Sequence, residues 1–185
     1  MAAMGAGGLA FFLAFMRVRL AARKPGSNEQ RAPLSIVGII LQMLGFSATG
    51  FGSVRMILAA ASSTSVLEAI AVTALMTTAV WLFVASAREM GRNWSLVART
   101  RSDHELVTGG PFARVRNPIY AAMALFLLGV AVGTGHERSL VWSLPLFAAG
   151  TWLRVREEER LLSASFGRAY AQYALRVRRF VPGLL

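Results

Sequence analysis

Two polar stretches in an otherwise apolar chain contain the residue types that could hold an anionic ligand. The first polar stretch, residues 106–120, contains Arg116 and Asn117 directly before Pro118, and an apolar run follows. Proline disfavours helical geometry in the residue before it, so a helix should begin at or just after Pro118. An anion such as a carboxylate would meet the Arg116 guanidinium, the Asn117 amide and the positive end of that helix. The stretch therefore predicts an anion-binding site.

A glycine turn precedes these residues in the same stretch. Thr108-Gly109-Gly110-Pro111 predicts a tight turn whose backbone N–H groups can face a ligand, because glycine tolerates positive φ and close approach. The alternative for Arg114 and Arg116 is that both arginines bind lipid headgroups.

The second polar stretch, residues 154–160, contains three consecutive carboxylates, Glu157, Glu158 and Glu159, which we expect to continue the last apolar helix beyond the membrane. Adjacent carboxylates repel, so we expect pairing with arginines, while a solvated helix face is the alternative. The candidate partners are Arg154, Arg160 and Arg116. An apolar and aromatic stripe at three- and four-residue steps follows, which indicates packing or a wall around a purine and ribose. It consists of Leu161, Leu162, Phe166, Tyr170, Tyr173 and Val177.

The composition places these stretches in a membrane protein. The chain has 185 residues, 55% of them hydrophobic and only 16% charged, whereas soluble domains carry roughly 25% charged residues. Cysteine is absent, and His104 and His136 lie too far apart to form a metal site on their own, so we expect no metal. The net charge of +11 could indicate nucleic acid, but the arginines lie at the ends of apolar runs, so no nucleic-acid partner is predicted.

Five apolar segments are predicted to form an all-α, polytopic membrane helical bundle. Three approach or exceed the ~20 residues that cross a bilayer, and the last two, of about 15 residues each, should extend into the interface. Pro145 should kink the last segment, and Gly38, Gly45, Gly50 and Gly52 predict close helix packing. The segments are residues 4–20, 34–54, 66–87, 119–133 and 140–153.

The basic residues predict the orientation of the bundle. All of them except Arg55 and Arg138 fall on one side of the predicted spans. The positive-inside rule therefore predicts a bacterial-type inner-membrane protein with its N-terminus outside and its C-terminus, with both polar stretches, in the cytoplasm. No Lys or Arg precedes Arg17, so we favour a retained first span over a cleaved signal peptide. Glycine-lined helices serve contacts within and between chains alike, so no oligomeric state is predicted.

Several motifs, taken together and in this order, resemble the integral-membrane methyltransferases that comprise isoprenylcysteine carboxyl methyltransferase and the phospholipid N-methyltransferases. They cover about half of the chain, from Gly91 onward. The motifs are Gly91-Arg92-Asn93-Trp94-Ser95, Leu106-Val107-Thr108-Gly109-Gly110-Pro111-Phe112, Arg116-Asn117-Pro118-Ile119-Tyr120, Glu158-Glu159, Phe166-Gly167, Tyr170, Tyr173 and Pro182.

The resemblance implies a cytoplasmic C-terminal catalytic region that binds S-adenosylmethionine and releases S-adenosylhomocysteine, with a lipophilic acceptor arriving through the bilayer. It implies catalytic roles for Arg154, which would orient an anionic acceptor, and for Glu158. Residues 1–90 would form three transmembrane helices, and residues 91–185 would form the methyltransferase core. The implied cofactor-binding residues are Val107, Gly109, Gly110, Pro111, Phe112, Arg116, Asn117, Pro118, Tyr120, Glu158, Glu159, Tyr170 and Tyr173.

The chain departs from the family pattern at two positions. Asn117 stands where the family usually has His, and Phe112 replaces a frequent Tyr. Asn can donate and accept hydrogen bonds but cannot take up a proton at neutral pH. A carboxylate acceptor, whose pKa in water is about 4, needs no base, so it is the favoured acceptor. The alternatives are a non-enzymatic lipid-binding or scaffold protein, and a membrane reductase that uses a nicotinamide cofactor.

Overall fold

Six α-helices make up most of the part of the chain that the structure describes. The computed structural model describes residues 2–21, 30–31, 34–52, 63–91, 99–100 and 105–183. The helices are α1 (Ala2–Ala21), α2 (Leu34–Gly50), α3 (Ser63–Met90), α4 (Pro118–Thr134), α5 (Leu140–Phe166) and α6 (Arg168–Arg176). Two short 3-10 helices, η2 (Gly110–Ala113) and η3 (Glu137–Ser139), precede α4 and α5. The predicted all-α class is confirmed.

A two-residue strand pair is the exception to the helical class. β1 (Gln30–Arg31) pairs antiparallel with β2 (Arg99–Thr100), with Gln30 opposite Thr100. This pairing joins the segment before α2 to the segment between α3 and η2. The sequence analysis predicted no strand there.

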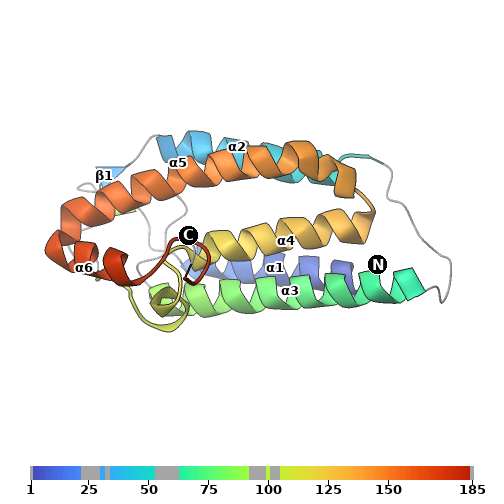
Figure 1. Cartoon of the computed structure of the whole chain (residues 1–185), viewed down its shortest axis with the longest axis horizontal. Helices are drawn as coiled ribbons and strands as arrows, with labels where there is room; N and C mark the ends of the chain where they lie inside the picture. Colours follow the sequence, from blue (N-terminus) through green and yellow to red (C-terminus); the bar gives the residue numbers. More distant parts are fainter. Residues whose placement is uncertain are drawn as a thin grey trace.

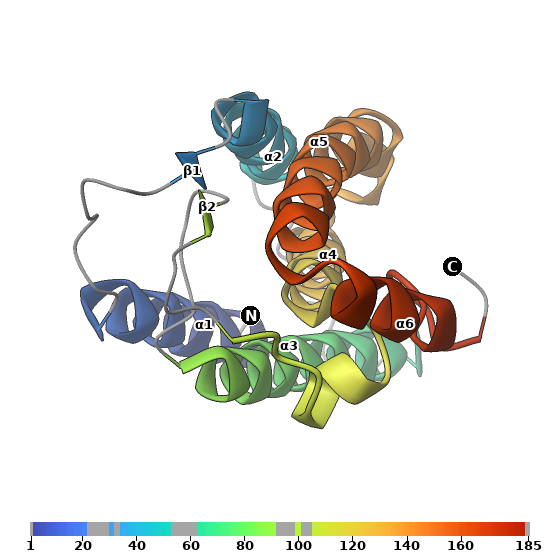
Figure 2. The same cartoon turned by 90° about the vertical axis from the view of Figure 1, so that its left-hand side faces the viewer.

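The five long helices run along one axis, and α2 lies beside α5 while α1 and α3 lie on the other side of the bundle (Figure 1). The end-on view shows α4 between these two groups (Figure 2). Because α2 packs on α5 and α3 packs on α4, the predicted N-terminal and C-terminal regions are in contact along the bundle. The division at residue 90 stays a prediction.

The α2–α5 contact is close because small residues line it. A Cβ atom on Gly150 of α5 would lie 2.5 Å from the Gly38 carbonyl oxygen, and one on Gly45 would lie 2.9 Å from the Ser143 carbonyl oxygen. Both distances are shorter than a packed interior allows. The prediction that glycines in this helix serve close packing is therefore confirmed for Gly38 and Gly45.

The opposite side of the bundle is held by aromatic packing. The Phe11 ring of α1 lies 4.8 Å from Phe83 of α3 and 4.4 Å from Phe126 of α4, measured between ring centroids. Ala79 and Ala122 are fully buried beside these rings and allow α3 and α4 to approach each other. These contacts fix α4, and with it the residues at its first turn.

The outward faces of the helices are apolar, as a bilayer requires. Large hydrophobic side chains are exposed on several helices, for example Phe12, Ile40, Trp81 and Trp142. Soluble monomers rarely expose apolar patches on this scale. The segments Ala2–Leu20 and Thr64–Met90 are long and apolar enough to cross a membrane.

Two apolar helices are shorter, and the bounds of the helices differ from the predicted spans. α2 and α4 have 17 residues each. α5 continues for 27 residues through Pro145, so the predicted fifth span and the second polar stretch form one helix. The predicted second span extended to Val54, which lies outside the described residues. Five transmembrane crossings, the kink at Pro145 and the orientation stay predictions.

Candidate functional site

The two polar stretches meet at one end of the bundle. The Tyr120 hydroxyl, in the first turn of α4, donates a 2.5 Å hydrogen bond to Glu158 Oε1 on α5. Arg154, one helical turn before Glu158, places its guanidinium 3.7 Å from the same oxygen and 5.2 Å from the centroid of the Tyr120 ring. Arg154, Glu158 and Tyr120 therefore form one cluster, although Tyr120 and Glu158 lie 38 residues apart in sequence.

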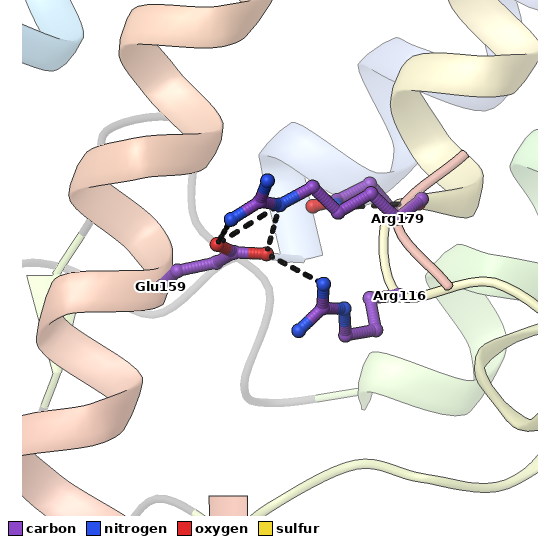
Figure 3. Close-up of polar contacts among 4 residues, drawn as sticks. Arg116, Glu159 and Arg179 are labelled. Carbon is purple, nitrogen blue, oxygen red and sulfur yellow. Dashed lines mark hydrogen bonds and ion pairs between the residues drawn. The ribbon is translucent and has the colours of Figure 1, made fainter. Parts of the chain in front are cut away.

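A second contact between the stretches is made by Glu159 (Figure 3). Its carboxylate lies 3.5 Å from Arg116 Nη2 and accepts hydrogen bonds from Arg179 Nε at 3.0 Å and Nη2 at 2.7 Å. The Arg116 and Glu159 side chains are 13% and 15% exposed, so this pair is largely shielded from solvent. The Glu159 carboxylate therefore joins α5 both to Arg116, which lies just before α4, and to Arg179 near the C-terminus.

The C-terminal segment, residues 177–179, pairs with the residues that lead into α4. The Arg116 backbone N–H donates to the Arg178 carbonyl at 2.8 Å, and the Asn117 N–H donates to the Arg179 carbonyl at 3.0 Å. Val115 and Arg178 form a parallel β-bridge. This pairing was not predicted, because three residues carry too little pattern to indicate a strand.

The predicted helix start is confirmed, and Asn117 precedes it without a side-chain bond to the first turn. α4 begins at Pro118, and Asn117 is its N-cap residue. The Asn117 amide nitrogen donates to the Arg179 carbonyl at 3.3 Å. The Asn117 side chain therefore helps to hold the C-terminal segment.

The predicted glycine turn is also present. Gly110 has a φ of +54°, a conformation that favours glycine, and η2 begins there. Phe112 is buried, and its carbonyl accepts a 2.7 Å hydrogen bond from the Tyr173 hydroxyl of α6. A Cβ on Gly110 would lie 3.0 Å from Glu89 Oε2 at the end of α3. The turn is therefore fixed between α3 and α6.

Two tyrosines of α6 close one side of the cluster. Tyr170 and Tyr173 are buried, with ring centroids 6.2 Å apart. Burial raises the pKa of Tyr173 to about 12, opposed by the positive charge of Arg116. Burial, followed by the negative charge of Glu159, raises the pKa of Tyr170. Both hydroxyls stay protonated at neutral pH and can donate hydrogen bonds.

The aromatic stripe spans two helices. α5 ends at Phe166, Gly167 has a φ of +48°, and α6 begins at Arg168. The positive φ favours glycine at this position. The chain changes direction there, which carries Tyr170 and Tyr173 back over η2.

The three carboxylates each pair with one of the predicted arginines. Glu157 pairs with Arg160 at 2.9 Å on the next turn of α5, while Glu158 faces Arg154 and Glu159 faces Arg116. The prediction of pairing is confirmed. Burial raises the pKa of Glu158, which the positive charge of Arg154 opposes.

One polar contact comes from a helix that the sequence analysis assigned only to packing. Gln42 of α2 is 2% exposed. Its Oε1 accepts a 3.3 Å hydrogen bond from Arg154 Nη1, and its Nε2 donates to Thr151 Oγ1 at 2.8 Å. A lone polar residue in an apolar run, eight residues after Leu34, was the available signal.

The remaining predicted residues are at least partly buried. Val107, Gly109 and Pro111 are half-buried, and Pro118 is buried at the start of α4. Part of the motif Gly91-Arg92-Asn93-Trp94-Ser95 lies outside the described residues, from Arg92 onward.

A separate groove of about 570 Å³ runs between α1 and α3, away from these residues. Its walls include Ala6, Gly7, Thr77 and Trp81, and Arg88 is the charged residue among them. None of the predicted site residues lines this groove.

Comparison with known proteins gives two methyltransferases and one resistance protein as relatives. The protein-S-isoprenylcysteine O-methyltransferase of Schizosaccharomyces pombe is 36% identical over 97 residues, 51% of this chain and 41% of that protein. The protein-S-isoprenylcysteine O-methyltransferase B of Arabidopsis thaliana is 32% identical over 98 residues, 50% of this chain and 48% of that protein. The cobalt-zinc-cadmium resistance protein CzcN of Cupriavidus metallidurans is 32% identical over 100 residues, 54% of this chain and 46% of that protein.

The chain spans about half the length of these curated relatives. Residues 67–169 match the phospholipid methyltransferase family. The match covers α4, α5 and most of α3, and thus more than half of the chain. The resemblance seen in the sequence motifs is confirmed: this chain belongs to the phospholipid methyltransferase family.

Proposed function

We propose that the chain transfers a methyl group from S-adenosylmethionine to a small lipophilic or lipid-tethered acceptor, with a carboxylate as the favoured acceptor. The observation that carries this proposal is the junction of the two polar stretches, where Tyr120 bonds Glu158 and Arg116 faces Glu159. Family membership supports the reaction class. The activity for which the two isoprenylcysteine relatives are named supports a lipophilic acceptor.

The residues at this junction fit the cofactor by charge. Arg116 Nε is buried and has no hydrogen-bond partner in the part of the chain that the structure describes. A buried, unsatisfied donor is costly, and a carboxylate such as that of the methionyl group would satisfy it. The Glu158 carboxylate would face the positive charge of the sulfonium, and Tyr170 and Tyr173 would line the nucleoside.

Each residue would have a limited task. When bound, S-adenosylmethionine supplies a methyl group on a positively charged sulfur. Arg154 would hold an acceptor carboxylate, and the turn from Val107 to Pro111 would contact the cofactor through its backbone. A carboxylate with a pKa of about 4 is ionised at neutral pH, so no residue has to remove a proton. Catalysis then rests on alignment and on exclusion of water.

The acceptor would reach Arg154 from the bilayer. We infer five membrane crossings with the N-terminus outside, since this puts the arginine-rich end of the bundle in the cytoplasm. The length of α5 supports this topology. Its 27 residues extend about 40 Å at the usual helical rise, which exceeds the ~30 Å hydrocarbon layer. The turns that carry Glu158 and Glu159 would therefore stand at the cytoplasmic surface.

Cofactor binding tests the proposal directly. Isothermal titration of the detergent-solubilised protein should show saturable binding of S-adenosylhomocysteine and none of NADPH. Arg116→Ala should abolish that binding, because it removes the unsatisfied donor. Arg114→Ala is the matched control, since Arg114 is exposed two residues away and should leave affinity unchanged.

Three outcomes contradict the proposal. Binding of NADPH alone would favour the reductase, and binding of neither S-adenosylhomocysteine nor NADPH would favour a scaffold. Equal affinity in Arg116→Ala and wild type would rule out the assigned cofactor site. Mass spectrometry of lipid extracts incubated with protein and isotope-labelled methyl donor would then identify the acceptor, with N-acetyl-S-farnesylcysteine and phosphatidylethanolamine as defined probes.

A further inference from the structure

Arg154 is held by residues from three helices. One of these helices, α2, lies outside the part of the chain that matches the phospholipid methyltransferase family. Tyr120 of α4 lies under its guanidinium, and Glu158 lies one turn further along α5. The third contact is Gln42 of α2, whose Oε1 accepts from Arg154 Nη1 at 3.3 Å. α2 ends at Gly50, whereas the family match begins at residue 67.

The face of α2 that meets Arg154 has two features suited to that side chain. Gly38 lies one turn before Gln42, and a Cβ atom there would lie 2.5 Å from Arg154 Cγ. The missing side chain of Gly38 therefore leaves room for the arginine stem. Gln42 then meets the guanidinium itself, so consecutive turns of α2 accommodate two parts of one arginine.

The Gln42 amide is itself held in a fixed orientation. Its Nε2 donates to Thr151 Oγ1 at 2.8 Å, which leaves Oε1 as the atom that faces Arg154. Gln42 and Arg154 are 2% and 7% exposed. A buried hydrogen bond to a charged donor is among the stronger polar contacts in proteins. Rotation of the guanidinium would break this bond and leave a buried acceptor without its partner.

We propose that Gln42 is a positioning residue that sets the plane of the Arg154 guanidinium toward the acceptor. This inference rests on the proposed function, in which Arg154 holds an anionic acceptor. It extends the acceptor site to α2, so this helix takes part in acceptor recognition as well as in packing.

Steady-state kinetics with N-acetyl-S-farnesylcysteine, or with the acceptor labelled in lipid extracts, tests the role. Gln42→Met keeps the length of the side chain but removes both the acceptor for Arg154 and the donor that bonds Thr151 Oγ1. We expect the acceptor kcat/KM to fall about 10- to 100-fold, the usual effect of losing a hydrogen bond to a charged group. The affinity for S-adenosylhomocysteine should stay that of wild type, because Gln42 does not contact Arg116 or the α6 tyrosines in the described structure.

Two further variants separate positioning from packing. Gln42→Glu keeps an oxygen for Arg154 but adds a charge that competes with an anionic acceptor, so kcat should be retained while KM rises. Thr49→Val is the matched control, because it removes another fully buried polar group of α2, a hydroxyl that bonds within its own helix at 3.1 Å to the Gly45 carbonyl. The kcat/KM of Thr49→Val, calculated per protein molecule that binds S-adenosylhomocysteine, should equal that of wild type.

A double-mutant cycle gives a readout that does not depend on activity. Thermal unfolding of Gln42→Met, Arg154→Met and the double variant should show non-additive losses, as expected for residues in direct contact. Additive losses, or a Gln42→Met variant with unchanged kcat/KM, would overturn this inference alone. A wild-type protein that neither binds S-adenosylhomocysteine nor transfers a methyl group would overturn the proposed function, and this inference with it.

Discussion

Removal of the Glu159 carboxylate should release the C-terminal segment from the start of α4. Glu159 accepts hydrogen bonds from Arg179 at 2.7 and 3.0 Å and faces Arg116 at 3.5 Å. In Glu159→Ala the two arginines keep their positive charges but lose the shared carboxylate. Residues 178 and 179 would then be held at the start of α4 without the Glu159 carboxylate. The remaining contacts would be the backbone bonds from Arg116 and Asn117 and the bond from the Asn117 side-chain amide.

The magnitude follows from the exposure of each side chain. Arg179 is 40% exposed, so solvent screening limits its pair with Glu159 to about 1 kcal/mol. Arg116 is 13% exposed, but its 3.5 Å separation is long, so we assign about 1 kcal/mol, below the usual range for a bond to a charged group. The Arg116–Glu159 pair does not include the C-terminal segment and stays intact when that segment opens, so only the Arg179 contribution counts. About 1 kcal/mol corresponds to an opened population roughly 5 times larger.

Limited trypsin digestion of the detergent-solubilised protein measures this opening. Cleavage after Arg179 releases a peptide that begins at Phe180 and can be quantified by mass spectrometry. When opening is fast relative to cleavage, the release rate follows the opened population. We therefore expect the peptide to appear about 5 times faster from Glu159→Ala than from wild type.

Glu157→Ala is the control for this experiment. It removes a carboxylate from the same helix, but its partner is Arg160, 2.9 Å away and 63% exposed. It should release the peptide at the wild-type rate. Equal release from Glu159→Ala and Glu157→Ala would refute the assignment of Glu159 as the link to the C-terminal segment.

Two further predictions concern pH. Burial raises the pKa of Glu158 above its ordinary value, so Glu158 should ionise at a higher pH than an exposed glutamate and should bind positively charged S-adenosylmethionine more tightly once ionised. Titration calorimetry over a pH series should show no such change for Glu158→Gln or for S-adenosylhomocysteine, whose sulfur is neutral. The pKa of Tyr173 is about 12 in the folded chain, against an ordinary value of 10.0, so its bond to the Phe112 carbonyl should contribute stability in full below pH 10 and lose it as pH rises toward 12. Tyr173→Phe should lower the unfolding free energy by about 1 kcal/mol below pH 10, and thermal unfolding that falls equally in both proteins at higher pH would contradict this.

The helical elements were predictable because their signals are local. Apolar runs, Pro118 and the glycines at 109 and 110 each act through neighbouring residues, and α4 and η2 begin where these residues predict. The pairing of three adjacent carboxylates with arginines followed from repulsion within one helix. The expectation that the three carboxylates continue the fifth helix past Leu153 is confirmed, because α5 runs from Leu140 to Phe166.

The contacts across the bundle could not be predicted in the same way. Arg179 was counted only as a basic residue, and nothing local shows that it shares Glu159 with Arg116. Gln42 likewise lies 112 residues from Arg154. Such pairs depend on how helices are arranged in space, and the sequence of one chain does not encode that arrangement in any short pattern.

The parallel bridge between Val115 and Arg178 has a consequence for the order in which the chain is assembled. Asn117 and Arg179 are 62 residues apart, so the ribosome makes the donors at the start of α4 long before their acceptors. During insertion into the bilayer, water or headgroups must satisfy those backbone N–H groups until α5 and α6 have emerged. This part of the protein should therefore mature last, and a released chain truncated before residue 177 should carry all of its long helices but lack the acceptors for the Arg116 and Asn117 N–H groups.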